Sequence, residues 1–406
     1  MSFLDRLLGR PTLENLIRDV ERWLRAQGFT DIRPNAERME VRYTRNGGQG
    51  MLSLGNLMRE YVNTPRKARA DLLERFLSGA LVAEDSTPTD YATAKPKLMP
   101  VVRSVGGMAL ARQGVAGAAP KPGTQPVQRP LVADLAVGLV IDLPTSMAYV
   151  QEKALDDWGV TWEQALQDAI ANLRGLPEHG GWKQIAPGVW SGEWGDSYES
   201  SRLLIPDLIY RVGISDPVAM APFRDSLLVT SAANPEGIAK MVQIAHDALN
   251  DRGRWVSFEL LRLDGTTWLP FTPTGEAATH QAQMMVRSRA EDYESQRHIL
   301  DGQLEDQQLD IFVASCSLLR KGDGPITSYA VWSEDVDTLL PEADSVVLIY
   351  KDGDKDWLTR LPWGVVREQF GHLMEPTDYV PTRYRLRQFP ERDALHQLAA
   401  TAGLDG

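Results

Sequence analysis

Cysteine is almost absent from this chain, because Cys316 is the only one among 406 residues. No internal disulfide and no cysteine-based zinc site can form within the chain, and such a composition suits a reducing compartment, so we expect a cytoplasmic location. The six histidines never recur at a metal-binding spacing, and the series Asp352, Asp354, Asp356 lacks the Gly and Glu that a calcium loop requires. We therefore expect no metal site and no cofactor.

Long hydrophobic runs are also missing. Even the apolar segment Leu131–Leu143 is shorter than the roughly 20 residues that span a bilayer, and it contains Asp134 and Asp142. We therefore expect no membrane association. The chain also lacks a phosphate-binding glycine loop, an HExxH zinc motif and a GxSxG nucleophile turn, so none of these three kinds of catalytic site is predicted.

Positive charge is in deficit, with 43 Lys and Arg residues against 55 Asp and Glu residues and a net charge of -12. A nucleic-acid binder needs a basic face to neutralise phosphates, so we expect no nucleic-acid partner. The deficit is uneven, because residues 91–130 contain six basic side chains and no acidic one. Within them, Ala111–Pro130 is rich in Gly, Ala and Pro and is predicted to be a flexible basic connector, either a spacer or a segment that docks on an acidic partner.

What the chain does contain is enough apolar sequence for several domains, since 43% of its residues are hydrophobic. We predict an α+β, multidomain fold with a central mixed sheet, amphipathic helices and a β-rich C-terminal unit. The predicted divisions are residues 1–88, a small N-terminal α+β unit; residues 89–130, a strand and the basic connector; residues 131–275, a central α+β domain; residues 276–304, a linking helix; and residues 305–406, a β-rich α+β domain.

The strongest local pattern lies in the central domain. Leu131–Leu143 is rich in Val and Ile and predicts a strand buried on both faces. Thr145 is placed to cap an amphipathic helix that ends at Gly159. A second helix is predicted from the capping box at Thr161 to Gly175. A strand followed by two helices with apolar faces requires a partner sheet, which the rest of the chain must supply.

Five short sequence segments resemble segments of the bacterial YtpQ family, in the same order along the chain. The function of that family is unknown. The segments are LMPVVRS (98–104), VIDLPTSMAYVQEKAL (140–155), ANLRGLP (171–177), GDSYESSRLL (195–204) and VAMAPFRDSLLV (218–229). The resemblance covers about residues 1–275 and is best over residues 98–275. It implies a cytosolic α+β protein without assigned activity, and it brings no catalytic residues to carry over.

One pair of motifs points to catalysis. Gly195-Asp196-Ser197, with Asp393 and His396 far downstream, has the pattern of the GDSL-type serine hydrolases. In that arrangement Ser197 would attack the substrate, His396 would take its proton and Asp393 would orient the imidazole. In those enzymes the GDS motif closes the first strand near the N-terminus, whereas here it lies in mid-chain. The other interpretation is a helix start capped by Asp196 or Ser197.

The densest polar group of the central domain surrounds the same motif. It is either a ligand site or a capped helix with a salt bridge at a strand end. Our leading functional hypothesis is a non-enzymatic binding or adaptor protein with an unknown protein or small-molecule partner, and the serine hydrolase is the alternative. The oligomeric state is open. The ligand-binding candidates are Asp196, Tyr198, Glu199, Arg202, Arg224 and Asp225.

Overall fold

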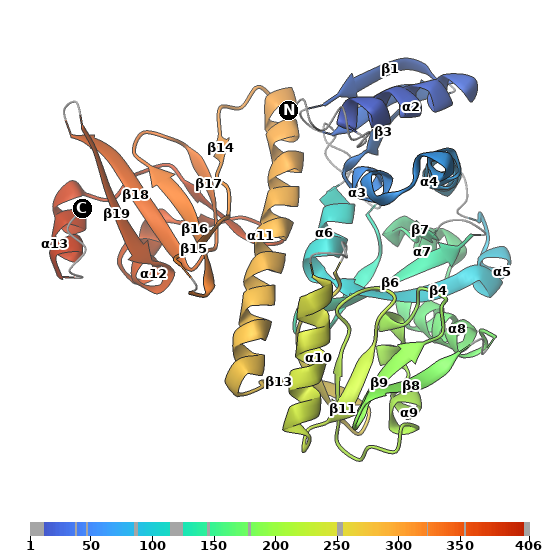
Figure 1. Cartoon of the computed structure of the whole chain (residues 1–406). Helices are drawn as coiled ribbons and strands as arrows, with labels where there is room; N and C mark the ends of the chain where they lie inside the picture. The colour runs from blue at the N-terminus through green and yellow to red at the C-terminus, as the bar shows by residue number, and fades with distance from the viewer. Residues whose placement is uncertain are drawn as a thin grey trace. The chain divides into compact units, whose positions relative to one another are not determined.

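The structure of the chain, a computed structural model, describes residues 12–36, 39–45, 48–84, 88–113, 125–143, 147–177, 180–249, 255–322, 324–352 and 355–401. It is a multidomain α+β fold with 41% helix, 32% strand and several separate sheets (Figure 1). The chain divides into two compact units. The first comprises Met1–Met99, Val140–Val150 and Ala154–Asn172, and the second comprises Pro100–Leu139, Gln151–Lys153 and Leu173–Gly406.

The N-terminal part of the first unit has its own hydrophobic core. Helix α2 begins after Thr12, whose hydroxyl accepts the Asn15 N–H at 3.3 Å, and it buries Leu16, Val20 and Leu24 as its periodicity predicts. The sheet order is β1-β2-β3, with antiparallel neighbours. The turn expected at residues 46–47 lies outside the described residues. The elements are α2 (Leu13–Ala26), β1 (Thr30–Asn35), β2 (Glu40–Arg45), β3 (Gly48–Ser53), α3 (Gly55–Asn63), η1 (Arg66–Ala68) and α4 (Arg69–Glu84).

The apolar segment at the centre of the sequence is a hairpin and not one strand. Ala133 has a φ of +50°, and the turn that it makes with Asp134 separates β5 from β6. Strand β6 is buried along Leu135–Ile141, as predicted for a strand covered on both faces. Residues 114–124 of the predicted connector lie outside the described residues, and its last residues belong to β5. The elements here are α5 (Tyr91–Ala94), η2 (Lys95–Lys97), β4 (Leu98–Ser104), α6 (Val105–Gln113), β5 (Gln128–Val132) and β6 (Leu135–Asp142), in the sheet order β4-β6-β5.

The helix predicted to follow Thr145 is wrong over its first half. Met147–Tyr149 forms strand β7, antiparallel to Val140–Asp142 of β6, and helix α7 (Glu152–Trp158) begins only afterwards. Pairing with a neighbouring strand satisfies the backbone of these residues, and that tertiary contact overrides the local helical periodicity. The second predicted helix is α8 (Trp162–Arg174), and the Thr161 hydroxyl accepts the Gln164 N–H at 3.2 Å, which confirms its cap.

A six-stranded sheet follows in the order β13-β12-β10-β11-β9-β8, and each neighbouring pair is antiparallel. Helix α10 lies against this sheet and buries Ile238, Met241 and Val242 on it (Figure 1). The helix start expected at Asp196 or Ser197 is absent, because residues 196–199 are not helical and the first helical turn is η3. The elements are β8 (Gly181–Ala186), β9 (Val189–Glu193), η3 (Ser200–Leu204), α9 (Pro206–Tyr210), β10 (Pro217–Met220), β11 (Leu228–Ser231), α10 (Pro235–Ala248), β12 (Leu260–Asp264) and β13 (Thr267–Phe271).

The predicted linking helix is α11 (Gly275–Asp306), which packs along α10 and against β14, β15 and β16. Two sheets follow, β14-β17-β21-β20 and β15-β16-β18-β19, in which β14 is parallel to β17 and β16 is parallel to β18. The elements are β14 (Phe312–Val313), β15 (Ser317–Arg320), β16 (Ile326–Ser333), β17 (Thr338–Pro341), β18 (Ser345–Asp352), β19 (Lys355–Pro362), α12 (Trp363–Phe370), η4 (Gly371–Leu373), β20 (Glu375–Pro376), β21 (Arg383–Leu386) and α13 (Arg392–Thr401).

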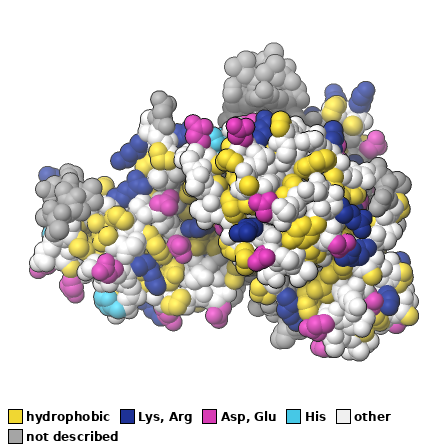
Figure 2. Space-filling view, turned by 90° about the horizontal axis from the view of Figure 1, so that it is seen from below, with side chains coloured by type: hydrophobic (Ala, Val, Ile, Leu, Met, Phe, Trp, Pro, Cys, Tyr) yellow, Lys and Arg dark blue, Asp and Glu magenta, His cyan; other side chains and the backbone are white. Residues whose placement is uncertain are grey.

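The exterior mixes side chains of different kinds. Figure 2 shows acidic, basic and apolar side chains interspersed over one face of the molecule. Within the described ranges, no helix combines the length and the hydropathy that crossing a membrane would require.

Candidate functional site

The sequence from Trp194 to Arg202 leaves β9 in a tight turn and enters η3; Gly195 and Ser197 are exposed, whereas residues 198–202 are buried. Gly195 has a φ of +73°, and Ser197 has a φ of +65°, a value that few residues other than glycine adopt. A Cβ at Gly192, in the preceding strand, would lie 2.2 Å from the Trp194 ring, so only glycine lets that indole fold back over the strand. These local constraints bury a strongly polar segment.

Asp196 and Arg202 close this turn by forming a salt bridge. The Arg202 guanidinium donates to both Asp196 carboxylate oxygens at 2.9 and 2.6 Å, and it stacks 4.1 Å from the centroid of the Trp194 ring. Burial raises the pKa of Asp196, but the hydrogen bonds and the charge of Arg202, with the Tyr198 N–H, outweigh burial and leave this pKa below its usual value. Two of the predicted ligand candidates therefore bind each other in a salt bridge, although the capped helix expected beside it is absent.

Glu199 differs from the paired Asp196 and Arg202 of this turn. Its side chain is only 2% exposed, and its Oε1 accepts the Gly195 N–H at 2.7 Å. The other oxygen, Oε2, is buried and has no hydrogen-bond partner among the described residues. A buried carboxyl oxygen without a donor is energetically unfavourable, so this atom requires an explanation.

A backbone hydrogen bond joins the two sequence segments that contain the candidate residues. The Ser200 N–H donates to the carbonyl of Arg224 at 3.2 Å, which holds the turn after β9 against the loop before β11. Asp225 in that loop is exposed, whereas the Arg224 side chain is half-buried and Tyr198 is buried. The structure thus gathers all six candidates in one region, but their side chains have different environments.

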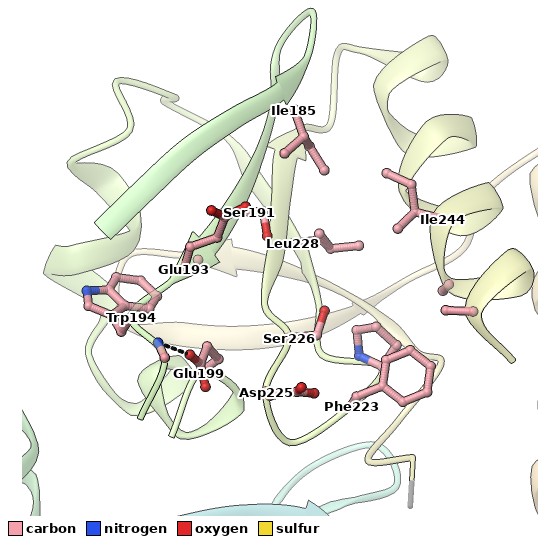
Figure 3. A pocket seen from close by; sticks show the side chains of 15 residues that line it. Ile185, Ser191, Glu193, Trp194, Glu199, Phe223, Asp225, Ser226, Leu228 and Ile244 are labelled. Carbon is pink, nitrogen blue, oxygen red and sulfur yellow. Dashed lines mark hydrogen bonds between the residues drawn. The ribbon is translucent and has the colours of Figure 1, made fainter. Parts of the chain in front are cut away.

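A cavity of about 570 Å³ opens beside this turn, between β8, β9, the loop before β11 and helix α10 (Figure 3). Of the six candidates, Glu199 and Asp225 line it, whereas Asp196, Tyr198, Arg202 and Arg224 do not. Figure 3 shows Glu199, Asp225 and Ser226 at one end and Ile185 and Ile244 toward the other. The full lining is Ile185, Ser191, Gly192, Glu193, Trp194, Gly195, Glu199, Pro222, Phe223, Asp225, Ser226, Leu228, Ile244, Ala245 and Ala248.

The apolar wall of the cavity is the part that sequence reasoning missed. The sequence gives no sign that helix α10 and the sheet separate around Ile244 and Ala248. The one available signal is the small size of Ala245 and Ala248, which leaves room between the helix and the sheet.

The three residues of the hydrolase hypothesis occupy separate environments. Ser197 lies in the turn after β9, whereas Asp393 is in the first turn of α13, and His396 Nε2 is 2.6 Å from the Tyr350 hydroxyl. Throughout the part of the chain that the structure describes, no hydrogen bond, ion pair or ring contact joins Ser197 to Asp393 or to His396. The hydrolase triad therefore remains a hypothesis from sequence alone.

The other residues considered for a chemical role, Cys316 and the aspartates near residue 352, lie in the core and in a hairpin. Burial raises the pKa of the Cys316 thiol to about 11, so this side chain stays protonated and is a poor nucleophile, as expected for a buried cysteine. Asp352 and Asp356 lie in the antiparallel hairpin of β18 and β19, opposite Lys355 and Lys351, and Asp354 lies outside the described residues. Among the described residues, no three His, Cys, Asp or Glu side chains are placed to hold one metal ion.

Comparisons with known proteins give no further guidance, since no protein-family model, curated protein or solved structure matches this chain.

Proposed function

We propose that the chain is a non-enzymatic binding protein that takes a small organic molecule into the cavity between β9, β11 and α10. The observation that carries this proposal is the combination of a cavity of about 570 Å³ with Glu199 in its lining, a buried residue whose Oε2 has no hydrogen-bond partner among the described residues. Small-molecule sites commonly have about this volume and combine apolar walls with a few placed polar groups. The contacts of the lining residues support binding more directly than catalysis, because none of the described residues that line the cavity is a His, Lys or Cys.

A second cavity, of about 600 Å³, supports this choice by contrast. It lies among α10, α11 and β15 and is lined in part by Trp255, Arg287, Glu294 and Cys316. Glu294 is held by Arg297 in a bidentate ion pair, and no lining residue there has a buried polar atom without a partner. The lining of the second cavity therefore lacks a residue comparable to Glu199.

The YtpQ-like relationship and the cytoplasmic location belong to the same proposal. The five sequence segments support both, and a family without assigned chemistry agrees with a binding or adaptor role. Two of those segments, GDSYESSRLL and VAMAPFRDSLLV, contain Glu199, Phe223 and Asp225, which line the cavity.

A cavity-blocking variant tests the function. Ala248→Trp places an indole in the cavity from α10, whereas Ala239→Trp makes the same change at an exposed position of α10 that does not line it. A set of cationic, neutral and anionic fragments would be screened against wild type and both variants by saturation-transfer NMR. We expect at least one fragment to bind wild type and Ala239→Trp but not Ala248→Trp. A screen in which no fragment distinguishes the two variants would contradict the proposal.

A further inference from the structure

We infer that the cavity selects an uncharged, largely apolar molecule with one hydrogen-bonding group, an inference that rests on the proposed function. The carboxylates of its described lining are not available as counter-charges for a ligand. Glu193 Oε2 lies 3.2 Å from the ammonium nitrogen of Lys183, and Asp225 has an interaction of its own. Glu199 Oε2 is closed to solvent. A charged ligand would therefore lose its water of hydration without meeting an unpaired opposite charge among these residues, which disfavours cations and anions alike.

Two hydroxyl groups are the side-chain polar atoms of the lining that a ligand can use. Ser191 lies on β9 and Ser226 in the loop before β11, and both side chains are half-buried. Neither hydroxyl forms a hydrogen bond to another described residue. A hydroxyl both donates and accepts, so it can bind a neutral hydroxyl, carbonyl or amide group. An uncharged ligand can therefore satisfy these atoms without a counter-charge.

Much of the remaining lining is apolar. Ile185 and Ile244 lie toward one end of the cavity, and Leu228 adds apolar wall between the strands and helix α10 (Figure 3). Ile185 is 36% exposed, so a hydrocarbon group placed beside it would take apolar surface out of water. Ser226 lies toward the opposite end (Figure 3). The ligand that fits both ends carries its polar group at one end and a hydrocarbon chain at the other.

Three probes of equal chain length separate charge from hydrophobicity: 1-octanol, octylammonium and octanoate, each titrated against the full chain by ligand-observed NMR. We expect 1-octanol to bind at least about tenfold more tightly than either charged probe. The reason is that a charge removed from water without a partner costs more than the roughly 1.4 kcal/mol to which a tenfold change corresponds. Ala248→Trp should abolish the binding of 1-octanol and Ala239→Trp should not, because only the first position lines the cavity.

The serine hydroxyls distinguish this inference from binding in any apolar cavity. The double variant Ser191→Ala/Ser226→Ala should weaken the binding of 1-octanol about three- to tenfold, the loss expected when one hydrogen bond to the ligand is removed. Ser215→Ala is the matched control, since Ser215 is exposed in the turn before β10 and does not line the cavity. It should leave the affinity for 1-octanol unchanged.

The outcomes separate this inference from the function beneath it. Equal or tighter binding of octylammonium or octanoate, abolished by Ala248→Trp, would overturn the assignment of an uncharged ligand and leave the binding function standing. Binding of 1-octanol that is unchanged in the double serine variant would also overturn the inference, because the cavity would then select for hydrophobicity alone. Failure of all three probes would overturn it as well, and the fragment screen would then decide the proposed function by itself.

Discussion

Arg383 provides the most demanding test of the interactions that hold the C-terminal part together. The side chain is fully buried, and it forms no hydrogen bond to a carboxylate. Its guanidinium donates to Gln296 Oε1 at 2.6 Å, to the carbonyls of Ala314 and Leu339 at 2.7 and 2.9 Å, and to the carbonyl of Tyr293 at 2.9 Å. It thereby ties α11 to the sheet that contains β17 and β21. Burial lowers the pKa of Arg383 to about 10, so the group remains charged at neutral pH.

Arg383→Met keeps an apolar chain of similar length and removes every donor. The Leu339 carbonyl also accepts the Ala314 N–H, and the Tyr293 carbonyl lies inside helix α11, so the acceptors left without a donor are Gln296 Oε1 and the Ala314 carbonyl. Each costs about 1–3 kcal/mol, a gross loss of about 2–6 kcal/mol. The variant recovers part of the cost of burying a charge, so we expect a net destabilisation of about 1–3 kcal/mol. Arg383→Lys keeps the charge, but three donors at one point cannot reach four acceptors on separate elements, and we expect a loss of about 1–3 kcal/mol.

Urea unfolding followed by tryptophan fluorescence measures these losses, because Trp332 is buried in the same region. Arg385→Met on the same strand is the matched control. Arg385 forms a bidentate pair with Asp337 at 3.1 and 2.8 Å, and both side chains are about 30% exposed, so its loss should cost less than about 1 kcal/mol. Equal shifts of the unfolding midpoint for Arg383→Met and Arg385→Met would refute the reasoning.

Two other predictions concern carboxyl and hydroxyl groups. Burial, with repulsion from Glu291 and Asp134, raises the pKa of Asp292 to about 7 from its usual 3.8. The unfolded chain therefore loses this proton at a lower pH than the folded chain does. The free energy of unfolding should fall as the pH rises from about 4 to 7. Asp292→Asn should remove that loss and raise the unfolding free energy at pH 8 by about 1–3 kcal/mol, with little gain at pH 4; an equal gain at both pH values, measured by urea unfolding, would contradict this origin. A fluorophosphonate probe should label neither wild type nor Ser197→Ala, whereas labelling of wild type alone would support the hydrolase alternative and contradict a non-enzymatic role.

The fold could be predicted where the local sequence pattern agrees with the tertiary contacts of the segment. The periodicity of α2 and the length of α11 were evident because each helix repeats one apolar or polar face over many residues. The segment Met147–Tyr149 was misassigned because its strand conformation depends on pairing with β6, which is a non-local contact. The turn at Ala133 was missed because an alanine at positive φ gives no signal in the sequence.

The candidate site could be predicted only in part, because some of its features are local in the sequence and others depend on non-local contacts. The density of polar residues in the sequence, which is visible in a single chain, singled out Glu199 and Asp225, and both line the cavity. Which of them pair with each other was not visible, and Asp196 with Arg202 proved to be a closed salt bridge. The cavity itself depends on the spacing between α10 and the sheet, which no single segment encodes.

The contrast between Arg383 and Glu199 leads to a last prediction. Both are buried ionisable side chains, but every acceptor around Arg383 receives a donor, while Oε2 of Glu199 receives none. A group retained only for stability should be satisfied, because an unsatisfied one lowers the stability of the fold. We therefore expect Glu199→Gln to leave the unfolding free energy unchanged or to raise it, since functional groups often reduce stability. The same urea titration measures this effect. A large loss of stability in this variant would instead assign Glu199 to the architecture of the turn, through the hydrogen bond that its Oε1 accepts from the Gly195 N–H.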